Sequence, residues 1–349
     1  MSIFVNDVIN KLPSGINLVG ADELPKPNYV PINSYRLGLC CPSMRKHTTD
    51  EGWQIFQGLE SAGYLLCGYE APINIVDVRI LLAFSPAVVA LQDPREWLLR
   101  SPTKVDKEEF QNWEVLAAVD TCFKVTILKD CHQHPHLYKL WHSSMGCHAW
   151  IVYYNERIVK HLCPFVRSQH LIRTYHTVDP AVVPSYTKDR DGIIISGAVS
   201  AHYPLRQRLF KELPDNLVFK AEHPGYGNTH CYTASFLQLL SRYKVSICTA
   251  SKYGYLLRKI IESTAAGCVV ISDLPADDIV PEIDSNIYRV SPDTSTKEIL
   301  ELALALCNDY DYDKQNYFAC LCKHRFNYKM EGTRLANAIE NLRANYGSI

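Results

Sequence analysis

The 349-residue sequence lacks any long apolar run. A helix that crosses a bilayer needs about 20 predominantly apolar residues, and no stretch of the chain approaches that length. The first residues, MSIFVNDVIN, reach the polar Asn6 and Asp7 too early for the apolar core of a signal peptide. We therefore expect a cytoplasmic protein with no transmembrane segment.

Cysteine spacings that hold metal ions are also absent. None of the 13 cysteines forms a Cys-x-x-Cys pair, and only one residue separates Cys320 from Cys322. Neither a zinc ribbon nor a small disulfide scaffold has this pattern. An odd number of cysteines, spread through apolar segments, favours reduced and buried thiols, as in cytosolic proteins.

The chain has no excess of charge of either sign. It contains 36 Lys and Arg against 37 Asp and Glu, which gives a formal net charge of −1. A protein whose main partner is a nucleic acid usually has a basic footprint. We expect no dominant nucleic-acid surface.

What the sequence does contain is a regular alternation of short strands and helices. The pattern predicts early strands at Tyr35–Ser43, Tyr64–Tyr69, Val76–Phe84, Phe123–Leu128 and Ala149–Tyr154. It predicts helices near Ala87–Gln92 and Glu108–Ala118, and a helical C-terminal region broken at Gly332. Such alternation indicates a doubly wound parallel α/β sheet, which binds ligands beyond the carboxyl ends of its strands.

The most informative stretch is YGYLLRKIIESTAAGCVVI, from Tyr253 to Ile271. Its apolar residues recur at helical spacing over Tyr255–Ala266, and a buried strand follows at Cys268–Ile271. Arg258 and Glu262 are four residues apart, close enough to pair on one face of the helix. Without further information, the stretch could equally be an ordinary helix–strand unit with a surface ion pair.

The run K-x-x-E-x-x-A-A-G-C-V-V-I-S-D, which starts at Lys259, resembles the nucleotide-sugar signature in the C-terminal domain of GT-B glycosyltransferases (glycosyl transferases group 1). The resemblance implies that Glu262 binds the donor ribose. It also implies that the preceding loop, with Tyr253 and Gly254, faces the diphosphate beside Arg258 and Lys259. Many retaining members have Glu-x7-Glu, whose first glutamate would fall at Gly254, so the inverting or retaining outcome stays open.

Two further segments extend the predicted donor site. A strand ends at Gly197, and the next helix begins with Pro204, followed by Arg206 and Arg208. Helix N-termini attract anions, and guanidinium groups bind phosphate. We predict diphosphate contacts from Arg206 and, as a second choice, Arg208, although both could lie on a solvated helix face. His223 opens a turn-rich loop after the next strand and is a further candidate.

The segment Asp130–His136 contains three histidines and one aspartate directly after a predicted strand. An extended segment would place the histidines on one side, as a metal site requires, but Pro135 argues against it. We predict an active-site loop, with His132 and Asp130 as the catalytic choice and His134 as the rival, because histidine titrates near neutral pH. The basic loop Arg45–His47 is the next alternative.

These observations predict two Rossmann-like domains that face each other across a cleft: an acceptor domain at 1–184, a donor domain at 185–330, and a helix at 331–349 that braces the first. The expected activity is metal-independent transfer of a hexosyl or pentosyl group from a nucleotide diphosphate sugar to a glycan or another hydroxyl acceptor, as in glycan biosynthesis. We expect no cofactor. The alternatives are a nucleotide-sugar epimerase or a non-catalytic nucleotide-binding relic.

Overall fold

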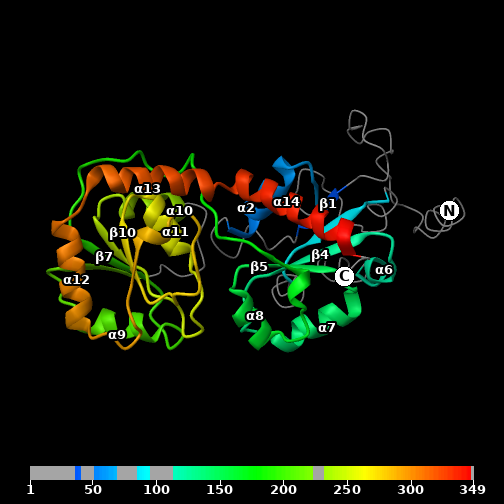
Figure 1. Ribbon diagram of the computed structural model, residues 1–349, viewed down its shortest axis with the longest axis horizontal. Coiled ribbons are helices and arrows are strands. Elements are labelled where there is room, and N and C mark those ends of the chain that lie inside the picture. Colours follow the sequence, from blue (N-terminus) through cyan, green and yellow to red (C-terminus); the bar gives the residue numbers. More distant parts are fainter. Residues whose placement is uncertain (1–35, 41–50, 69–84, 95–112, 223–231, 347–349) are drawn as a thin grey trace, which may run out of the picture.

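Two parallel β-sheets form the frame of the protein (Figure 1). The computed structural model describes residues 36–40, 51–68, 85–94, 113–222 and 232–346. The first sheet consists, in spatial order, of β2 (Leu65–Gly68), β1 (Arg36–Cys40), β3 (Val88–Leu91), β4 (Phe123–Leu128), β5 (Ala149–Val152) and β6 (Leu171–Arg173). The second consists of β11 (Ile287–Arg289), β10 (Val269–Ser272), β9 (Val245–Ile247), β7 (Ile193–Gly197) and β8 (Val218–Glu222). All these pairings are parallel, which confirms the predicted α/β class.

The first sheet and the helices on its two faces make up what we call the N-terminal unit. On one face lie α2 (Glu51–Ser61) and α14 (Tyr328–Asn345). The other face carries α6 (Trp113–Ala118), α7 (Pro135–Met145) and α8 (Glu156–Leu162). Buried apolar side chains fill both interfaces, so the residues of the central strands are shielded from solvent on both faces of the sheet. A short 3-10 turn (Ser168–His170) leads into β6.

The second sheet is covered in the same way and forms the C-terminal unit. One face packs on α9 (Pro204–Glu212) and α12 (Thr296–Asn308). The other packs on α10 (Tyr232–Leu240) and α11 (Arg258–Ala265), with α13 (Tyr312–Arg325) lying over α11. A second 3-10 turn (Asp284–Asn286) precedes β11.

Strand β3 (Val88–Leu91) lies within Ala87–Gln92, and the helix predicted there is wrong. All four residues of β3 are buried, and the strand pairs with β1 on one side and β4 on the other. A short run that is apolar at every position fits a doubly covered parallel strand. Its periodicity does not separate strand from helix, but its length and its two adjacent valines favour a strand. The strand predicted at Val76–Phe84 lies outside the described residues.

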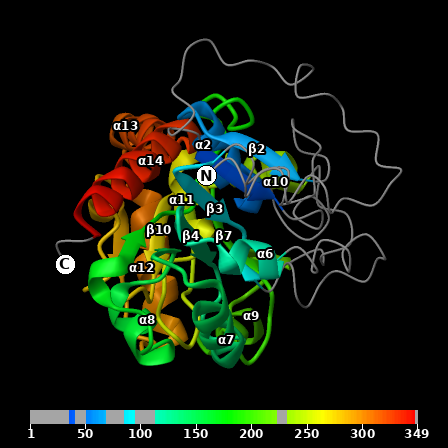
Figure 2. The same ribbon diagram turned by 90° about the vertical axis from the view of Figure 1, so that its right-hand side faces the viewer.

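The chain passes between the units twice, and the two crossings touch. The first crossing follows β6, and the second joins α13 to α14. The amide of Val178 donates a hydrogen bond of 2.9 Å to the carbonyl of Phe326, and Val178 forms a parallel bridge with Asn327. Figure 2 shows α13, α14 and α2 along the same side of the molecule.

One buried carboxylate holds the crossings together. Glu331 of α14 is 2% exposed, and it accepts hydrogen bonds from the hydroxyl of Thr174 (2.8 Å) and the amide of Tyr175 (3.2 Å) on the first crossing. It also pairs with Arg325 at the end of α13 and with Arg334 one turn further along α14. A buried charge is tolerated only when it is paired and hydrogen-bonded, and Glu331 meets both conditions.

The sequence predicted a helix break at Gly332, and this prediction is wrong. The break is at Phe326 and Asn327, where the Asn327 side chain caps α14 by accepting from the Lys329 amide. Gly332 lies inside α14 and faces Gly58 of α2. A Cβ atom on Gly332 would lie only 2.0 Å from the carbonyl carbon of Gly58, so glycine is needed here for the close approach of two helix backbones.

We expect Gly332→Ala to lower the free energy of unfolding by about 1–3 kcal/mol, the usual range for overpacking. The substitution should be destabilising even though alanine favours a helix by about 0.5–1 kcal/mol over glycine. Asn337→Ala, at an exposed position of the same helix, is the matched control. Denaturant unfolding followed by circular dichroism measures both. Equal stability of the two variants would contradict the close packing of α14 on α2.

Candidate functional site

Two cationic side chains lie against the backbone at the end of strand β7. Its last residue, Gly197, has a positive φ of 121°, and a Cβ atom there would lie 2.5 Å from Nη1 of Arg206 and 2.9 Å from Cε of Lys259. Arg206 comes from α9 and Lys259 from the first turn of α11. The structure therefore brings three predicted donor-site residues together at the carboxyl edge of the second sheet, the edge at which such folds bind ligands.

The Arg206 guanidinium is buried and held in place by neutral oxygen atoms. It donates to the hydroxyl of Thr249 (3.0 Å), the carbonyl of Thr249 (2.9 Å) and the carbonyl of Ala198 (3.2 Å), and it lies over the ring of Tyr203. Burial lowers the pKa of Arg206. No carboxylate within the described segments forms an ion pair with it. Its charge is oriented but is not neutralised by direct contact.

Lys259 is the second cation of this group. Its ammonium lies over the ring of Phe236, 4.4 Å from the centroid. Burial lowers the pKa of Lys259 to about 8; Glu262 opposes this shift, and the charge of Arg206 adds to it. A nearby anion favours the protonated form of an amine, so an anion bound beside Lys259 would raise its pKa again.

The predicted pair of Arg258 and Glu262 is present, but it is buried and does not lie on the surface. Nε of Arg258 is 3.0 Å from Oε1 of Glu262, and both side chains are less than a tenth exposed. The pair flanks Lys259 in the same helix, with Arg258 one residue before it and Glu262 three residues after it. Asp273 is a second carboxylate in this region, and it accepts a hydrogen bond from the amide of Ala250, which follows β9. The group thus contains two carboxylates, Glu262 and Asp273, and three cations, Arg206, Arg258 and Lys259. The excess positive charge favours an anionic ligand.

Helix α11 begins at Arg258, three residues later than predicted, and the preceding residues form a loop. Gly254 has a φ of 61°, and a Cβ atom there would lie 2.9 Å from Cγ of Pro275. A glutamate at this position would need a different loop conformation. Tyr253, next to it, points toward the N-terminal unit, where its ring meets that of His132.

Two predicted donor residues lie apart from this group. The Arg208 guanidinium donates to the carbonyls of Pro292 and Thr294, so it anchors the loop before α12. His223 lies outside the described residues, as does the alternative loop Arg45–His47.

In the N-terminal unit, the loop after β4 places Asp130 and His132 beside Tyr154, which follows β5. The Tyr154 hydroxyl donates to Oδ1 of Asp130 (2.9 Å) and lies 3.2 Å from Nδ1 of His132. His134 is directed elsewhere: it is the N-terminal cap residue of α7, and its ring meets that of His136.

The His132 ring lies at one of the contacts between the two units. Its centroid is 4.5 Å from that of Tyr253, 5.8 Å from Tyr255 and 6.0 Å from His202, all residues of the C-terminal unit. The amide of Lys252 donates to the carbonyl of His202, which ties the two contributing loops together. The sequence prediction missed Tyr154, Tyr255 and His202. The signals were weak: Tyr154 ends the predicted strand Ala149–Tyr154, Tyr255 begins the predicted helix Tyr255–Ala266, and His202 follows the strand that ends at Gly197.

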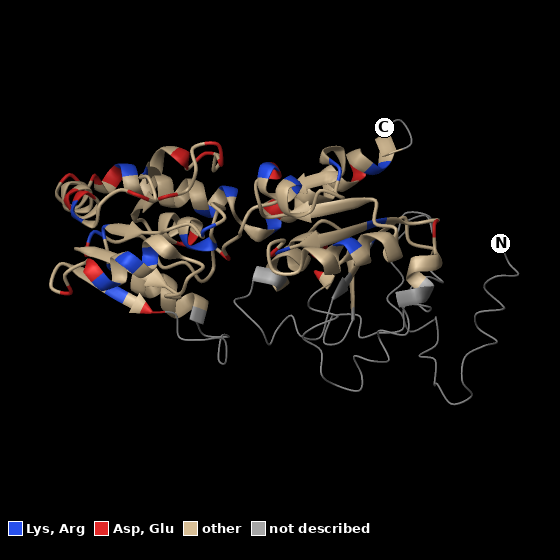
Figure 3. Ribbon diagram, turned by 90° about the horizontal axis from the view of Figure 1, so that it is seen from below, with Lys and Arg blue, Asp and Glu red and all other residues tan. Residues whose placement is uncertain are grey.

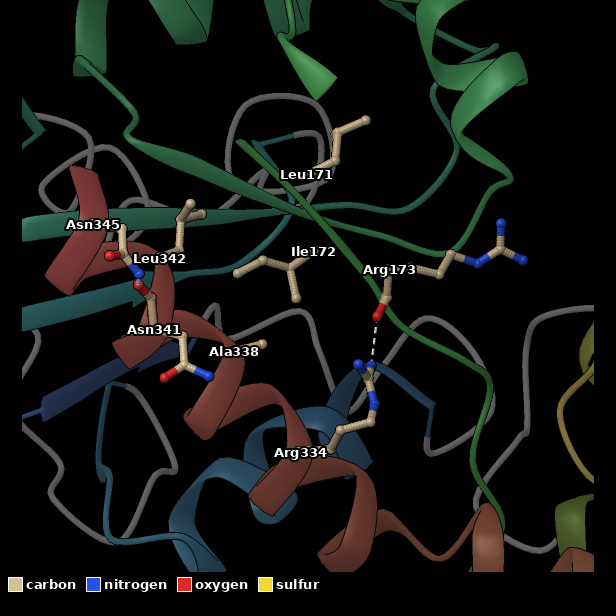
Figure 4. A pocket seen from close by; sticks show the side chains of 8 residues that line it. All are labelled: Leu171, Ile172, Arg173, Arg334, Ala338, Asn341, Leu342 and Asn345. Atoms are coloured by element: carbon tan, nitrogen blue, oxygen red, sulfur yellow. Dashed lines mark hydrogen bonds between the residues drawn. The ribbon is translucent and has the colours of Figure 1, made fainter. Parts of the chain in front are cut away.

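A separate pocket lies at the edge of the first sheet, between β6 and α14 (Figure 4). The Arg334 guanidinium donates to the carbonyl of Arg173 at its rim, and the Arg173 side chain points away from the pocket to Asp278. Both arginines thus have partners within the protein. The pocket shares no residue with the group around Gly197 or the group around His132.

The described residues also allow general statements about charge and metal ligands. Basic and acidic residues are interspersed along both units (Figure 3). Within the described ranges, no three His, Cys, Asp or Glu side chains are placed to hold a metal ion together. No described helix has the length and apolar character needed to cross a membrane.

Comparison of the sequence with protein-family models and with curated proteins gives no match. Solved structures do match. A glycosyltransferase from Rickettsia africae superposes with a TM-score of 0.51 at 9% identity, covering 90% of this chain and 100% of that chain. The fold is that of a glycosyltransferase. HepE of Anabaena in complex with UDP and glucose has a TM-score of 0.58 at 9% identity, covering 88% of this chain and 100% of that chain. The predicted resemblance is confirmed as one of fold.

We expect Lys259 to link diphosphate binding to pH. In the free protein, Lys259 loses its proton near pH 8, whereas the unfolded chain keeps it up to about pH 10.5. Lys259 therefore makes the free energy of unfolding increase as the pH rises through this window. A bound diphosphate reverses the shift, so binding at pH 8 should take up about half a proton at Lys259.

Calorimetric titration with a nucleoside diphosphate, in buffers of different ionisation enthalpy, measures this proton uptake. In Lys259→Met the uptake should vanish. Equal uptake by the two proteins would show that the ligand lies away from Lys259.

Proposed function

We propose that the protein transfers a sugar from a nucleoside diphosphate sugar to a hydroxyl group of a glycan or another acceptor. One observation carries the proposal: the cationic group around Gly197 belongs to the C-terminal unit, and His132 of the N-terminal unit contacts Tyr253 of that same C-terminal unit. A donor held by the C-terminal unit would have its reacting carbon next to a titratable histidine. The glycosyltransferase fold supports this arrangement.

In the proposed architecture the two units are Rossmann-like domains of GT-B type that face each other across a cleft. Residues 1–184 would form the acceptor domain and residues 185–330 the donor domain. Residues 331–349 would brace the first domain, in keeping with the packing of α14 on α2. The ten cysteines whose side chains are described are free thiols. We propose a cytoplasmic location.

For the donor, we propose that Arg206 and Lys259 bind the diphosphate. The guanidinium, already fixed by Thr249, would need no reorganisation to stabilise the charge of the leaving group. Gly197 would let the phosphates approach the backbone closely. Glu262 would accept hydrogen bonds from the ribose hydroxyls, with Arg258 holding its carboxylate. Because protein cations neutralise the diphosphate, we propose that hexosyl or pentosyl transfer needs no metal ion.

The chemical step would break the bond between the anomeric carbon and the diphosphate oxygen. The electron pair of that bond leaves with the nucleoside diphosphate, and the acceptor oxygen forms the new bond to carbon. The proton of the acceptor hydroxyl must then be removed. His132 would take it in an inverting reaction. In a retaining reaction His132 would position a hydroxyl by hydrogen bonding, and the acceptor proton would pass to the departing diphosphate oxygen. Gly254 leaves both outcomes open.

A donor screen tests the proposed function. Nucleotide sugars are screened for thermal stabilisation of the protein, beginning with UDP-glucose because a similar structure, HepE, was solved with it (TM-score 0.56, 10% identity). A ligand at 100 times its Kd adds about 2.7 kcal/mol to the folded state. Stabilising donors are then incubated with alcohol and glycan acceptors. Isomerisation of the sugar without transfer would indicate an epimerase, and binding without any turnover a relic.

The two predicted arginines should behave differently. Arg206→Gln should weaken nucleoside diphosphate binding by about 1.5–3 kcal/mol, the range for a hydrogen bond to a charged group, and leave nucleoside binding unchanged. Arg208→Gln is the matched comparison, because Arg208 lies on the same helix but donates to Pro292 and Thr294. Calorimetry with both ligands measures the effect. If Arg206→Gln weakens nucleoside and nucleoside diphosphate equally, the arginine does not bind the phosphates.

His132→Ala should reduce turnover by about 10²–10⁴-fold, the range of a positioned general base, with donor affinity nearly intact. His134→Ala is the internal comparison, because it lies two residues away with its ring against His136. Steady-state kinetics on the donor found in the screen measures both variants. A loss confined to His134→Ala would assign the chemistry to the other histidine.

A further inference from the structure

Hydrogen bonds link three side chains in a row: Asp130 after β4, Tyr154 after β5, and His132, again after β4. Tyr154, 1% exposed, lies between Asp130 and His132. Its hydroxyl donates to Oδ1 of Asp130 at 2.9 Å and is 3.2 Å from Nδ1 of His132. Since β4 and β5 are parallel neighbours, their carboxyl ends lie side by side, and the rigid sheet fixes the spacing of the three groups.

The number of hydrogens decides the direction of each hydrogen bond. A phenol has one hydrogen, and an ionised carboxylate can only accept, so the Tyr154 hydrogen goes to Asp130. The Tyr154 oxygen is then an acceptor, and Nδ1 of His132 must carry the hydrogen that it receives. A neutral imidazole has one N–H, which leaves Nε2 of His132 with its lone pair. Burial, followed by the charge of Asp130, raises the pKa of Tyr154 well above 10, so the phenol keeps its hydrogen.

We propose that Tyr154 is a positioning residue that holds His132 in the Nδ1–H tautomer and so makes Nε2 the acceptor for a substrate hydroxyl. The inference rests on the proposed function, which it deepens: Tyr154 links Asp130 to His132 through two hydrogen bonds. It applies to both stereochemical outcomes, because Nε2 receives a hydrogen from a hydroxyl in either.

The C-terminal unit contributes to the same arrangement. The Tyr255 ring meets the Tyr154 ring edge-on at 4.1 Å and lies nearly parallel to the His132 ring. Tyr253 covers the His132 ring at 4.5 Å. These aromatic contacts hold the imidazole in the plane in which its Nδ1 reaches Tyr154. Because Tyr253 and Tyr255 belong to the C-terminal unit, the orientation of the His132 ring depends on the contact between the units.

Tyr154→Phe is the decisive variant, because it keeps the ring and removes the hydroxyl. Long-range proton–nitrogen NMR on protein labelled with ¹⁵N-histidine reads each tautomer directly, and the resonances lost in His132→Gln assign His132 among the 13 histidines. We expect Nδ1–H in the unsubstituted protein and its loss in Tyr154→Phe. We also expect kcat to fall about 10–100-fold, the usual effect of removing a partner that orients a functional histidine. KM for the donor should change less than about twofold, because Tyr154 does not belong to the group around Gly197.

Tyr153→Phe is the matched control: it is the adjacent residue, and its ring stacks on His176 in the opposite face of the sheet. Thermal melting verifies that both variants fold. An Nε2–H tautomer in the unsubstituted protein, or the same tautomer in Tyr154→Phe, would overturn the proposal. So would a tautomer change with kcat unaltered. If His132 has the Nδ1–H form but no donor is turned over, the proposed function fails while the tautomer assignment stands.

Discussion

The arrangement of the two units depends on the hydrogen bonds and ion pairs of one buried carboxylate, that of Glu331. Glu331 belongs to the last helix, yet its partners are the first crossing, at Thr174 and Tyr175, and arginines on both sides of the second crossing. Removing one partner of such a buried group leaves an uncompensated charge, which is strongly destabilising. The network therefore fixes the two crossings relative to each other. Through them it fixes the distance between the strand ends of one unit and those of the other.

The candidate site needs that fixed distance because neither unit holds it alone. The C-terminal unit supplies the cations at the end of β7, and the N-terminal unit supplies Asp130, Tyr154 and His132. The loop before α11 connects them, since it carries both Gly254, whose positive φ suits glycine, and the tyrosines that reach His132. Had the helix begun at Tyr255, as its apolar spacing suggested, that ring would have followed the helical turn instead of extending toward Tyr154.

Patterns along the chain were sufficient for the fold class and for a good part of the site. Helical spacing and the glycine after it located α11 and β10, and glycine before a proline-led helix pointed to Arg206. Strand β3 (Val88–Leu91) was missed because a run that is apolar at every position shows neither the two-residue period of a strand nor the 3.6-residue period of a helix. The partnership of Tyr154 with His132 was out of reach for another reason: it arises from sheet register and from the packing of one unit on another, which a single sequence does not encode locally.

The position of α14 has a consequence for how the protein is made. Residues 328–345 supply Leu335, Ala336 and Ile339 to the core of the first sheet, although more than 150 residues separate them from β6. A ribosome therefore releases the strands of the N-terminal unit long before the helix that covers them. In that interval only α2 covers this face of the sheet, and the apolar area that α14 will cover stays exposed, which is the condition under which nascent chains aggregate or require chaperones. Shortening the chain at its end would thus damage the half of the molecule that was synthesised first.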